Sequence, residues 1–191
     1  MGSCSSLEIG HGRHGEVFRM SDVVNLTGII NWEAVTFGGA VVDLVVDDDD
    51  YVIKRVKKQR NFDRELVNNR IVYDLTTDFR EATPFDAGGI AYIRNVINEE
   101  KFLVLKNLKP LVGISIGEDM TLVHATLQLL HANHYVHNDV KKTNIMRVAA
   151  TGKCILIDYG DMSLGDPISK KKENIRFKDV RTDALRVVHL V

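Results

Sequence analysis

Short runs of apolar residues dominate the first half of the chain, and several of them are rich in β-branched side chains bounded by glycine or aspartate. These runs predict strands at 7–20 (a strand, a glycine turn and a second strand), 40–46, 51–56, 91–96 and 101–108. The looser stretch between residues 20 and 40 predicts no element. The last two runs predict a hairpin, because the short polar stretch Asn98-Glu99-Glu100 lies at the turn between them.

Helical spacing appears at two places inside this pattern. Residues 61–75 carry Phe62, Leu66, Asn69 and Tyr73 near one stripe, which predicts an amphipathic helix. The second helix is predicted to begin at a capping box formed by Ser115 and Glu118 and to end near Asn133. Its apolar positions are Met120, Val123, Leu127 and Leu130.

Beyond that helix the pattern predicts two short strands and one last helix. The strands fall at 144–148 and 153–158 and are joined by a glycine-containing turn. Lys170–Lys172 is interpreted as a solvated basic run, and 179–191 is predicted to be helical. The whole order indicates one α+β domain over 1–191 with two lobes. A β-rich lobe with its connecting strand covers 7–108, and a mainly helical lobe covers 109–191.

Composition indicates an ordinary globular protein. The 191 residues are 45% hydrophobic and 27% charged, with a net charge of −1. This balance argues against nucleic acid as the main partner. Two cysteines argue against a disulfide framework and favour a reducing, intracellular compartment, and no apolar run is long enough to span a membrane.

The first six residues add one local signal. Gly2 and Ser6 fit the N-myristoylation pattern, and Cys4 is a candidate for a second acyl chain. Acylation there would add a membrane contact, since two lipid signals anchor a protein more stably than one. The alternative is a plain Ser-rich start without a lipid.

A glycine-rich loop and one lysine are candidates for phosphate binding, and a glutamate is a candidate partner for that lysine. The glycine-rich loop covers Ile9, Gly10, His11, Gly12, Arg13, His14, Gly15, Glu16 and Val17. Missing side chains let backbone N–H groups approach an anion closely. Lys54 lies in the run 51–56 and could neutralise phosphate. Glu65 shares the inward stripe of the predicted helix and needs a partner there, for which Lys54 is a candidate.

A second set of polar residues surrounds the predicted strands of the second half. Asp139 and Asn144 lie five positions apart in a loop, and Asp158 follows the hairpin. A hairpin returns its ends to one place, so Asn144 and Asp158 should be neighbours with oxygen atoms suited to Mg²⁺. Asp139 is then left to accept a proton, and Lys141 lies two residues away to offset negative charge.

Histidines provide a competing interpretation. His131, His134 and His137 recur every three residues, as zinc ligands can. The helix is expected to break at Asn133, so the three would not share a face. No cysteine lies nearby, which disfavours a zinc site.

Taken together, these motifs resemble the signatures of the eukaryotic-type protein kinases. The matching features are the glycine loop, Val-Ile-Lys at 52–54, the helix Glu65, the His-x-Asp-x-Lys-x-x-Asn loop at 137–144 and Asp-Tyr-Gly at 158–160. The resemblance runs from about residue 7 to residue 164. Lys141 is typical of Ser/Thr kinases, and the loop is also similar to the casein-kinase and vaccinia-related branch.

The resemblance implies a role for each motif. The glycine loop would cover ATP, and Lys54 would hold its α- and β-phosphates while pairing with Glu65. Asp139 would be the catalytic base for a protein hydroxyl, and Lys141 would contact the γ-phosphate. Asn144 and Asp158 would hold Mg²⁺. We would then expect a monomer that phosphorylates protein substrates inside a cell, the host cell if the source is viral.

Departures from the family pattern leave other functions open. Asn138 replaces the usual Arg that pairs with a phosphate on the activation loop, so control by phosphorylation of that loop is expected to be absent. The stretch after Asp158 is short and contains no Ala-Pro-Glu sequence, which implies a shortened second lobe. The alternatives are a pseudokinase that binds nucleotide and docks a partner, and a small-molecule phosphotransferase.

Overall fold

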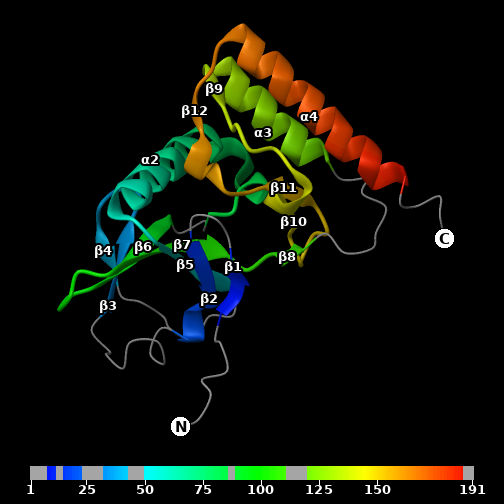
Figure 1. Ribbon diagram of the computed structural model, residues 1–191. Coiled ribbons are helices and arrows are strands. Elements are labelled where there is room, and N and C mark those ends of the chain that lie inside the picture. Colours follow the sequence, from blue (N-terminus) through cyan, green and yellow to red (C-terminus); the bar gives the residue numbers. More distant parts are fainter. Residues whose placement is uncertain are drawn as a thin grey trace. The chain divides into compact units, whose positions relative to one another are not determined.

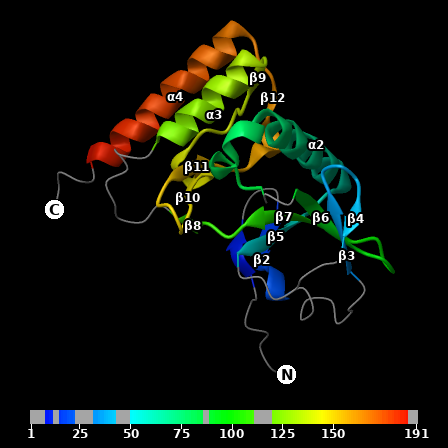
Figure 2. The same cartoon turned by 180° about the vertical axis from the view of Figure 1, so that it is seen from behind.

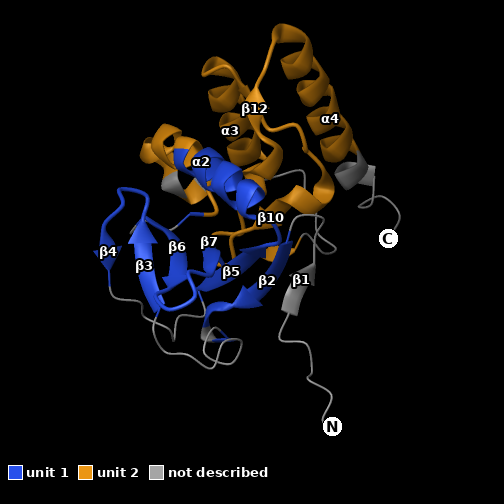
Figure 3. Ribbon diagram, turned by 60° about the vertical axis from the view of Figure 1, so that its left-hand side comes forward, with its two compact units in different colours: residues 1–70, 85–107 blue, residues 71–84, 108–191 orange. Residues whose placement is uncertain are grey.

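The computed structural model describes residues 8–11, 15–22, 32–42, 50–85, 89–110 and 120–186. It is a mixed α+β structure that divides into two units (Figures 1 and 3). Unit 1 comprises residues 1–70 and 85–107, and unit 2 comprises 71–84 and 108–191. Helix α2 (Gln59–Leu75) therefore contributes residues to both units.

Unit 1 is built on an antiparallel sheet of seven strands in the order β1-β2-β5-β7-β6-β3-β4 among the described residues. The strands are β1 (Glu8–His11), β2 (Gly15–Arg19), β3 (Trp32–Thr36), β4 (Val41–Val42), β5 (Tyr51–Val56), β6 (Ile90–Asn95) and β7 (Lys101–Lys106). The strand β5 and the hairpin β6–β7 are confirmed, since Arg94 faces Lys101 across its turn. Of the predicted strand 40–46, only Val41–Val42 is described as a strand, and 43–46 lie outside the described residues.

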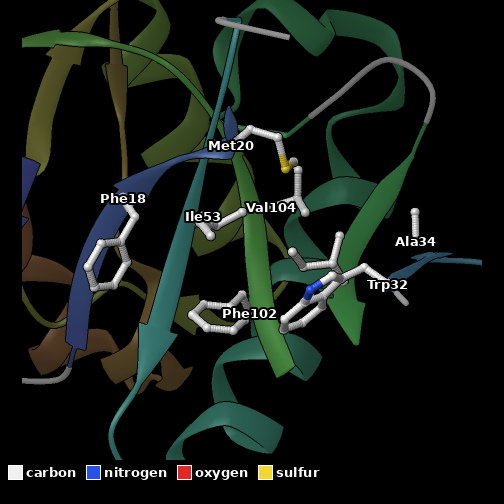
Figure 4. Packing of buried hydrophobic residues seen from close by; sticks show 8 residues of the cluster. Phe18, Met20, Trp32, Ala34, Ile53, Phe102 and Val104 are labelled. Carbon is white, nitrogen blue, oxygen red and sulfur yellow. The ribbon is translucent and has the colours of Figure 1, made fainter. Parts of the chain in front are cut away.

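The hydrophobic pattern missed β3, which lies in the stretch between residues 20 and 40. Trp32 and Ala34 of this strand join the core of the sheet, where the Trp32 and Phe102 rings meet edge-on with centroids 5.4 Å apart (Figure 4). Glu33, on the opposite face, pairs with Arg94 of the neighbouring β6 at 2.8 Å. The strand is therefore held by contacts across the sheet, which the local alternation of residues does not reveal.

Unit 2 combines two helices with short strands. Helix α3 (Thr121–Ala132) ends at Ala132 with Asn133 as its C-cap, close to the predicted end, whereas the capping box at Ser115 and Glu118 lies outside the described residues. Helix α3 packs on the strands β9 (Tyr135–Val136) and β11 (Cys154–Leu156). The remaining strands are β8 (Lys109–Pro110), β10 (Ile145–Arg147) and β12 (Ser163–Leu164). The predicted hairpin of β10 and β11 is confirmed, with Ile145 opposite Leu156.

The last helix begins twelve residues before its predicted start at 179. Helix α4 spans Pro167–Arg186 and includes the basic run Lys170–Lys172, in which Lys171 and Lys172 are exposed. Asp166 accepts a hydrogen bond from Ser169 N at 2.7 Å, which caps the helix, and Pro167 occupies the first turn, where proline is favoured. Figures 1 and 2 show α3 and α4 side by side, and His124 stacks on Phe177 between them.

Candidate active site

The glycine-rich segment enters unit 1 as the hairpin of β1 and β2, in which His11 faces Glu16. Gly12, Arg13 and His14 lie outside the described residues, while Ile9, Gly10 and His11 are in β1 and Gly15, Glu16 and Val17 are in β2. Gly15 is required for packing, because a Cβ there would overlap the carbonyl oxygen of Arg55 on β5. Its lack of a side chain thus sets the close approach of β2 to β5, the strand that carries Lys54.

Lys54 and Glu65 form the expected ion pair inside unit 1. Lys54 Nζ donates to Glu65 Oε1 at 2.7 Å, and the two residues are 8% and 2% exposed. Lys54 lies on β5, an interior strand of the sheet, and Glu65 is on the inward face of α2. A buried lysine that keeps its charge needs such a carboxylate, so the pair fixes the direction of the ammonium group.

In unit 2 the hairpin brings together Asn144 and the residue before Asp158. Asn144 O accepts from Ile157 N at 2.9 Å, directly beyond the Ile145–Leu156 pair of the hairpin. Asp158 has a left-handed backbone, with φ 64° and ψ 67°. Left-handed non-glycine residues are uncommon and concentrate at functional sites, because the surrounding structure must hold them there.

Asp139 is the centre of the polar cluster in unit 2. Its Oδ2 accepts from Asn144 Nδ2 at 2.8 Å and from Lys141 Nζ at 2.6 Å. Asn144 Nδ2 also donates to the backbone oxygen of Asp139 at 2.9 Å, and Asn144 is 5% exposed. The carboxylate is therefore held through one oxygen by two donors, and its other oxygen, Oδ1, is the one available to accept a proton.

His137 is a buried, neutral imidazole that forms hydrogen bonds with the backbone at Asp139 and Ile157. The ring is fully buried; its Nε2 donates to Ile157 O at 2.9 Å, and its Nδ1 accepts from Asp139 N at 3.3 Å. A single neutral tautomer satisfies both contacts. Burial lowers the pKa of His137 below its usual 6.5, in agreement with that state. His137 thus links the backbone of Asp139 to the residue before Asp158.

Tyr159 packs against the imidazole ring of His137. Its ring lies edge-on to that of His137, with centroids 5.0 Å apart, and its hydroxyl donates to Leu156 O at 3.1 Å. Complete burial raises the pKa of the Tyr159 phenol, so the side chain stays neutral. The residue after Asp158 is therefore an internal anchor for the end of the hairpin.

The oxygen atoms of Asn144 and Asp158 fit a magnesium ion chemically. Mg²⁺ prefers a few protein oxygens together with water and phosphate. Because both described hydrogen bonds of the Asn144 side chain use Nδ2, its Oδ1 is the atom left for a metal. Asp158 would add a carboxylate oxygen from the end of the same hairpin.

The histidine series does not form a zinc site among the described residues. His131 Nε2 lies 2.7 Å from Glu173 Oε2, and His137 is engaged by backbone groups. His134 is exposed and has a positive φ of 65° just beyond the end of α3. Within the described part of the chain, no group of three or more His, Cys, Asp or Glu side chains is arranged to hold a metal.

Three contributions of α4 and Asn138 were missed from the sequence. Glu173 is 2% exposed and accepts from Asn138 N at 2.7 Å, and Arg176 NH1 donates to Asn138 O at 2.9 Å. Asn138 Nδ2 donates to Asp161 O and Ser163 Oγ, each at 2.9 Å. The available signal was Asp166-Pro167, a helix cap followed by a favoured first residue, which would have placed Glu173 inside a helix.

The two groups of candidate residues belong to different units, with Lys54 and Glu65 in unit 1 and the Asp139 cluster in unit 2.

No helix in the described ranges has both the length and the apolar character needed to cross a lipid bilayer.

No protein-family model matches this chain, and no curated protein matches it either.

Proposed function

We propose that this chain is an ATP-dependent serine/threonine protein kinase with a kinase-like two-lobed fold that transfers the γ-phosphate of ATP to protein hydroxyl groups. The observation that carries the proposal is the Asp139 cluster, in which Lys141 and Asn144 hold one carboxylate oxygen at 2.6 and 2.8 Å. The order of these residues along the loop is that of the kinase catalytic loop, and the buried Lys54–Glu65 pair supports the same interpretation.

Asp139 is the base in this mechanism. With Oδ2 held by two donors, Oδ1 accepts a hydrogen bond from the serine or threonine hydroxyl. It takes up the hydroxyl proton as the oxygen bonds to the γ-phosphorus and the bond from that phosphorus to the leaving ADP breaks. Lys141, whose side chain is 52% exposed, can leave Asp139 to contact the γ-phosphate. Most of the rate enhancement in phosphoryl transfer comes from such positioning and charge stabilisation.

The phosphates of ATP are assigned to Lys54 and to the glycine-rich segment, 9–17. Glu65 accepts a hydrogen bond from the Lys54 ammonium group at 2.7 Å, so that the cation is positioned before the nucleotide binds. Asn144 and Asp158 would hold Mg²⁺, which supplies charge neutralisation of the phosphates when bound.

The test is transfer of labelled phosphate from ATP to general protein substrates by wild type, Asp139→Ala and Lys54→Met. We expect both variants to lose roughly 100-fold or more, the range for removal of a general base or a phosphate contact. Asp63→Asn and Lys57→Met change exposed residues of the same types and should retain wild-type activity. Equal transfer by wild type, Asp139→Ala and Lys54→Met would disprove the proposal. Thermal stabilisation by ATP without any transfer would instead identify a nucleotide-binding docking module.

A further inference from the structure

Helix α4 exposes two isoleucines on the side that is opposite to α3. Ile168 and Ile175 are 65% and 50% exposed. They are seven positions apart, so they share one side of the helix and lie about 10 Å apart along its axis. Glu173 and Phe177, which contact α3, are buried on the other side. Within unit 2, Figures 1 and 2 show α3 along one side of α4 and no described element along the opposite side.

Basic residues surround these two isoleucines. The outer face of α4 is defined here as Ile168, Lys171, Lys172, Ile175 and Lys178, all of them exposed. Over 167–182, the exposed residues of α4 include five basic side chains and one acid, namely Lys171, Lys172, Arg176, Lys178 and Arg181 against Asp179. Since the whole chain has a net charge of −1, the helix carries a local excess of positive charge.

Isoleucines placed among lysines fit the surface of a lipid bilayer. The aliphatic part of a lysine side chain lies along apolar surface while its ammonium group reaches a polar layer. At a bilayer, the isoleucines enter the boundary of the acyl chains and the lysines meet anionic headgroups. A nucleic-acid backbone would bind the lysines but offers no apolar layer to the isoleucines. The combination therefore favours a membrane over nucleic acid.

The N-terminal sequence provides an independent observation that points to the same partner. Gly2 and Cys4, the candidate acyl acceptors, lie outside the described residues. One acyl chain alone binds a membrane only marginally, and a basic patch is one of the features that make such attachment stable. An acylated chain would thus need a basic surface, which the outer face of α4 provides.

From these features we propose that the outer face of α4 binds membranes that contain anionic phospholipids. The helix lies along the bilayer surface, with its two isoleucines at the acyl boundary and its three lysines beside the headgroups. The inference does not rest on the proposed kinase function, because neither the Asp139 cluster nor the Lys54–Glu65 pair contributes a residue to the outer face.

Sedimentation with lipid vesicles tests the surface in the full chain carrying Gly2→Ala and Cys4→Ser, which cannot be acylated at those positions. This chain should bind vesicles of mixed phosphatidylserine and phosphatidylcholine, and should bind pure phosphatidylcholine vesicles roughly tenfold more weakly or less. High salt should release it, because exposed charges are screened. Absence of binding to the mixed vesicles, or equal binding to both kinds, would overturn the inference.

Removal of charge locates the contact. In the same background, Lys171→Gln with Lys172→Gln should weaken binding to the mixed vesicles by roughly tenfold or more, because each basic residue near an anionic surface adds to the attraction. Lys57→Gln with Lys58→Gln removes two exposed lysines from unit 1 and should leave binding unchanged. Equal losses in the two pairs would show that net charge, not the outer face of α4, controls binding.

Removal of the apolar side chains separates a membrane from other polyanions. Ile168→Ser with Ile175→Ser keeps every charge and should weaken binding to the mixed vesicles by roughly fivefold or more, because the apolar contact with the bilayer is lost. Val96→Ser with Ile97→Ser changes two exposed apolar residues of unit 1 and should bind as the parent chain does. Unchanged binding by the first pair would overturn the inference, and binding to duplex DNA that depends on Lys171 and Lys172 would then identify a nucleic-acid surface.

Discussion

Lys54 Nζ and Glu65 Oε1 lie 2.7 Å apart within unit 1, joining the interior strand β5 to the inward face of α2. The side chains are only 10% and 3% exposed, so neither charge is well solvated without the other. A buried ion pair contributes little net free energy to folding, but the removal of one partner destabilises the folded state strongly. The pair therefore couples the proposed phosphate contact to the folding of unit 1.

A double-substitution cycle tests this coupling. Lys54→Met alone removes the Lys54 cation from the buried Glu65 carboxylate and should reduce the free energy of unfolding by about 3–5 kcal/mol. Lys54→Met combined with Glu65→Leu removes both charges and should recover most of that loss, because apolar replacements of buried pairs are often neutral or stabilising. Denaturant unfolding measures these two values and that of Glu65→Leu alone, which completes the cycle, with Lys57→Met as the exposed control.

Additive losses in that cycle would contradict the coupling. In that case Lys54 and Glu65 would contribute independently, and the helix α2 would not depend on β5 for the placement of its carboxylate. We expect phosphate transfer to be lost whether or not the losses of stability are additive, so the unfolding measurement and the activity measurement report on different properties of the same pair.

The elements whose residues follow a local period were predictable from the sequence. Residues 61–75 carry a helical stripe and form nearly all of α2, and the runs 51–56 and 101–108 contain β5 and β7. The inward position of Glu65 also followed from that stripe. In each case, the packing partner selects the same face that the local pattern indicates.

Elements held by long-range contacts were not predictable in this way. The strand β3 depends on Trp32 packing against Phe102 and on the ion pair of Glu33 with Arg94, 61 positions apart. Helix α4 has few apolar residues at helical spacing, and its buried face includes the charged Glu173 together with Phe177. A buried acid cannot be distinguished from a solvated one until its partners, His131 and Asn138, are placed.

His137 makes the stability of unit 2 depend on pH. Burial lowers its pKa below 6.5 in the folded chain, so the unfolded chain binds the proton more readily. The stability it contributes is complete above pH 6.5 and is lost as pH falls from there through the lowered pKa, by at most about 1.4 kcal/mol per pH unit. Protonation would also remove Nδ1 as the acceptor for Asp139 N.

Thermal unfolding between pH 7.5 and 5 checks this expectation. The midpoint of wild type should fall more steeply below pH 6.5 than that of His137→Gln, which has no proton to gain in this range. His134→Asn alters an exposed histidine and retains a residue that tolerates its positive φ, so its slope should equal that of wild type. Parallel curves for wild type and His137→Gln would show that another group controls the acid sensitivity.

Asn138 offers a further test of the proposed function, because protein kinases usually have arginine at the position that we assign to Asn138. Asn138→Arg should not restore control by phosphorylation. The substitution removes the hydrogen bonds to Asp161 O and Ser163 Oγ and places arginine at φ 68°, a region that costs L-residues about 1–2 kcal/mol but which asparagine tolerates. We expect kcat to fall about tenfold and the unfolding midpoint to decrease.

Phosphatase treatment completes the comparison. Wild type should keep its full activity after treatment, since Asn138 orders the segment after Asp158 through hydrogen bonds to unmodified groups. Asn174→Arg, an exposed substitution of the same kind on α4, should behave as wild type in every assay. A large loss of wild-type activity on dephosphorylation would place the switch elsewhere in the chain. An Asn138→Arg variant that gained activity would show that the amide contacts are dispensable, because arginine would then order the loop better than asparagine does.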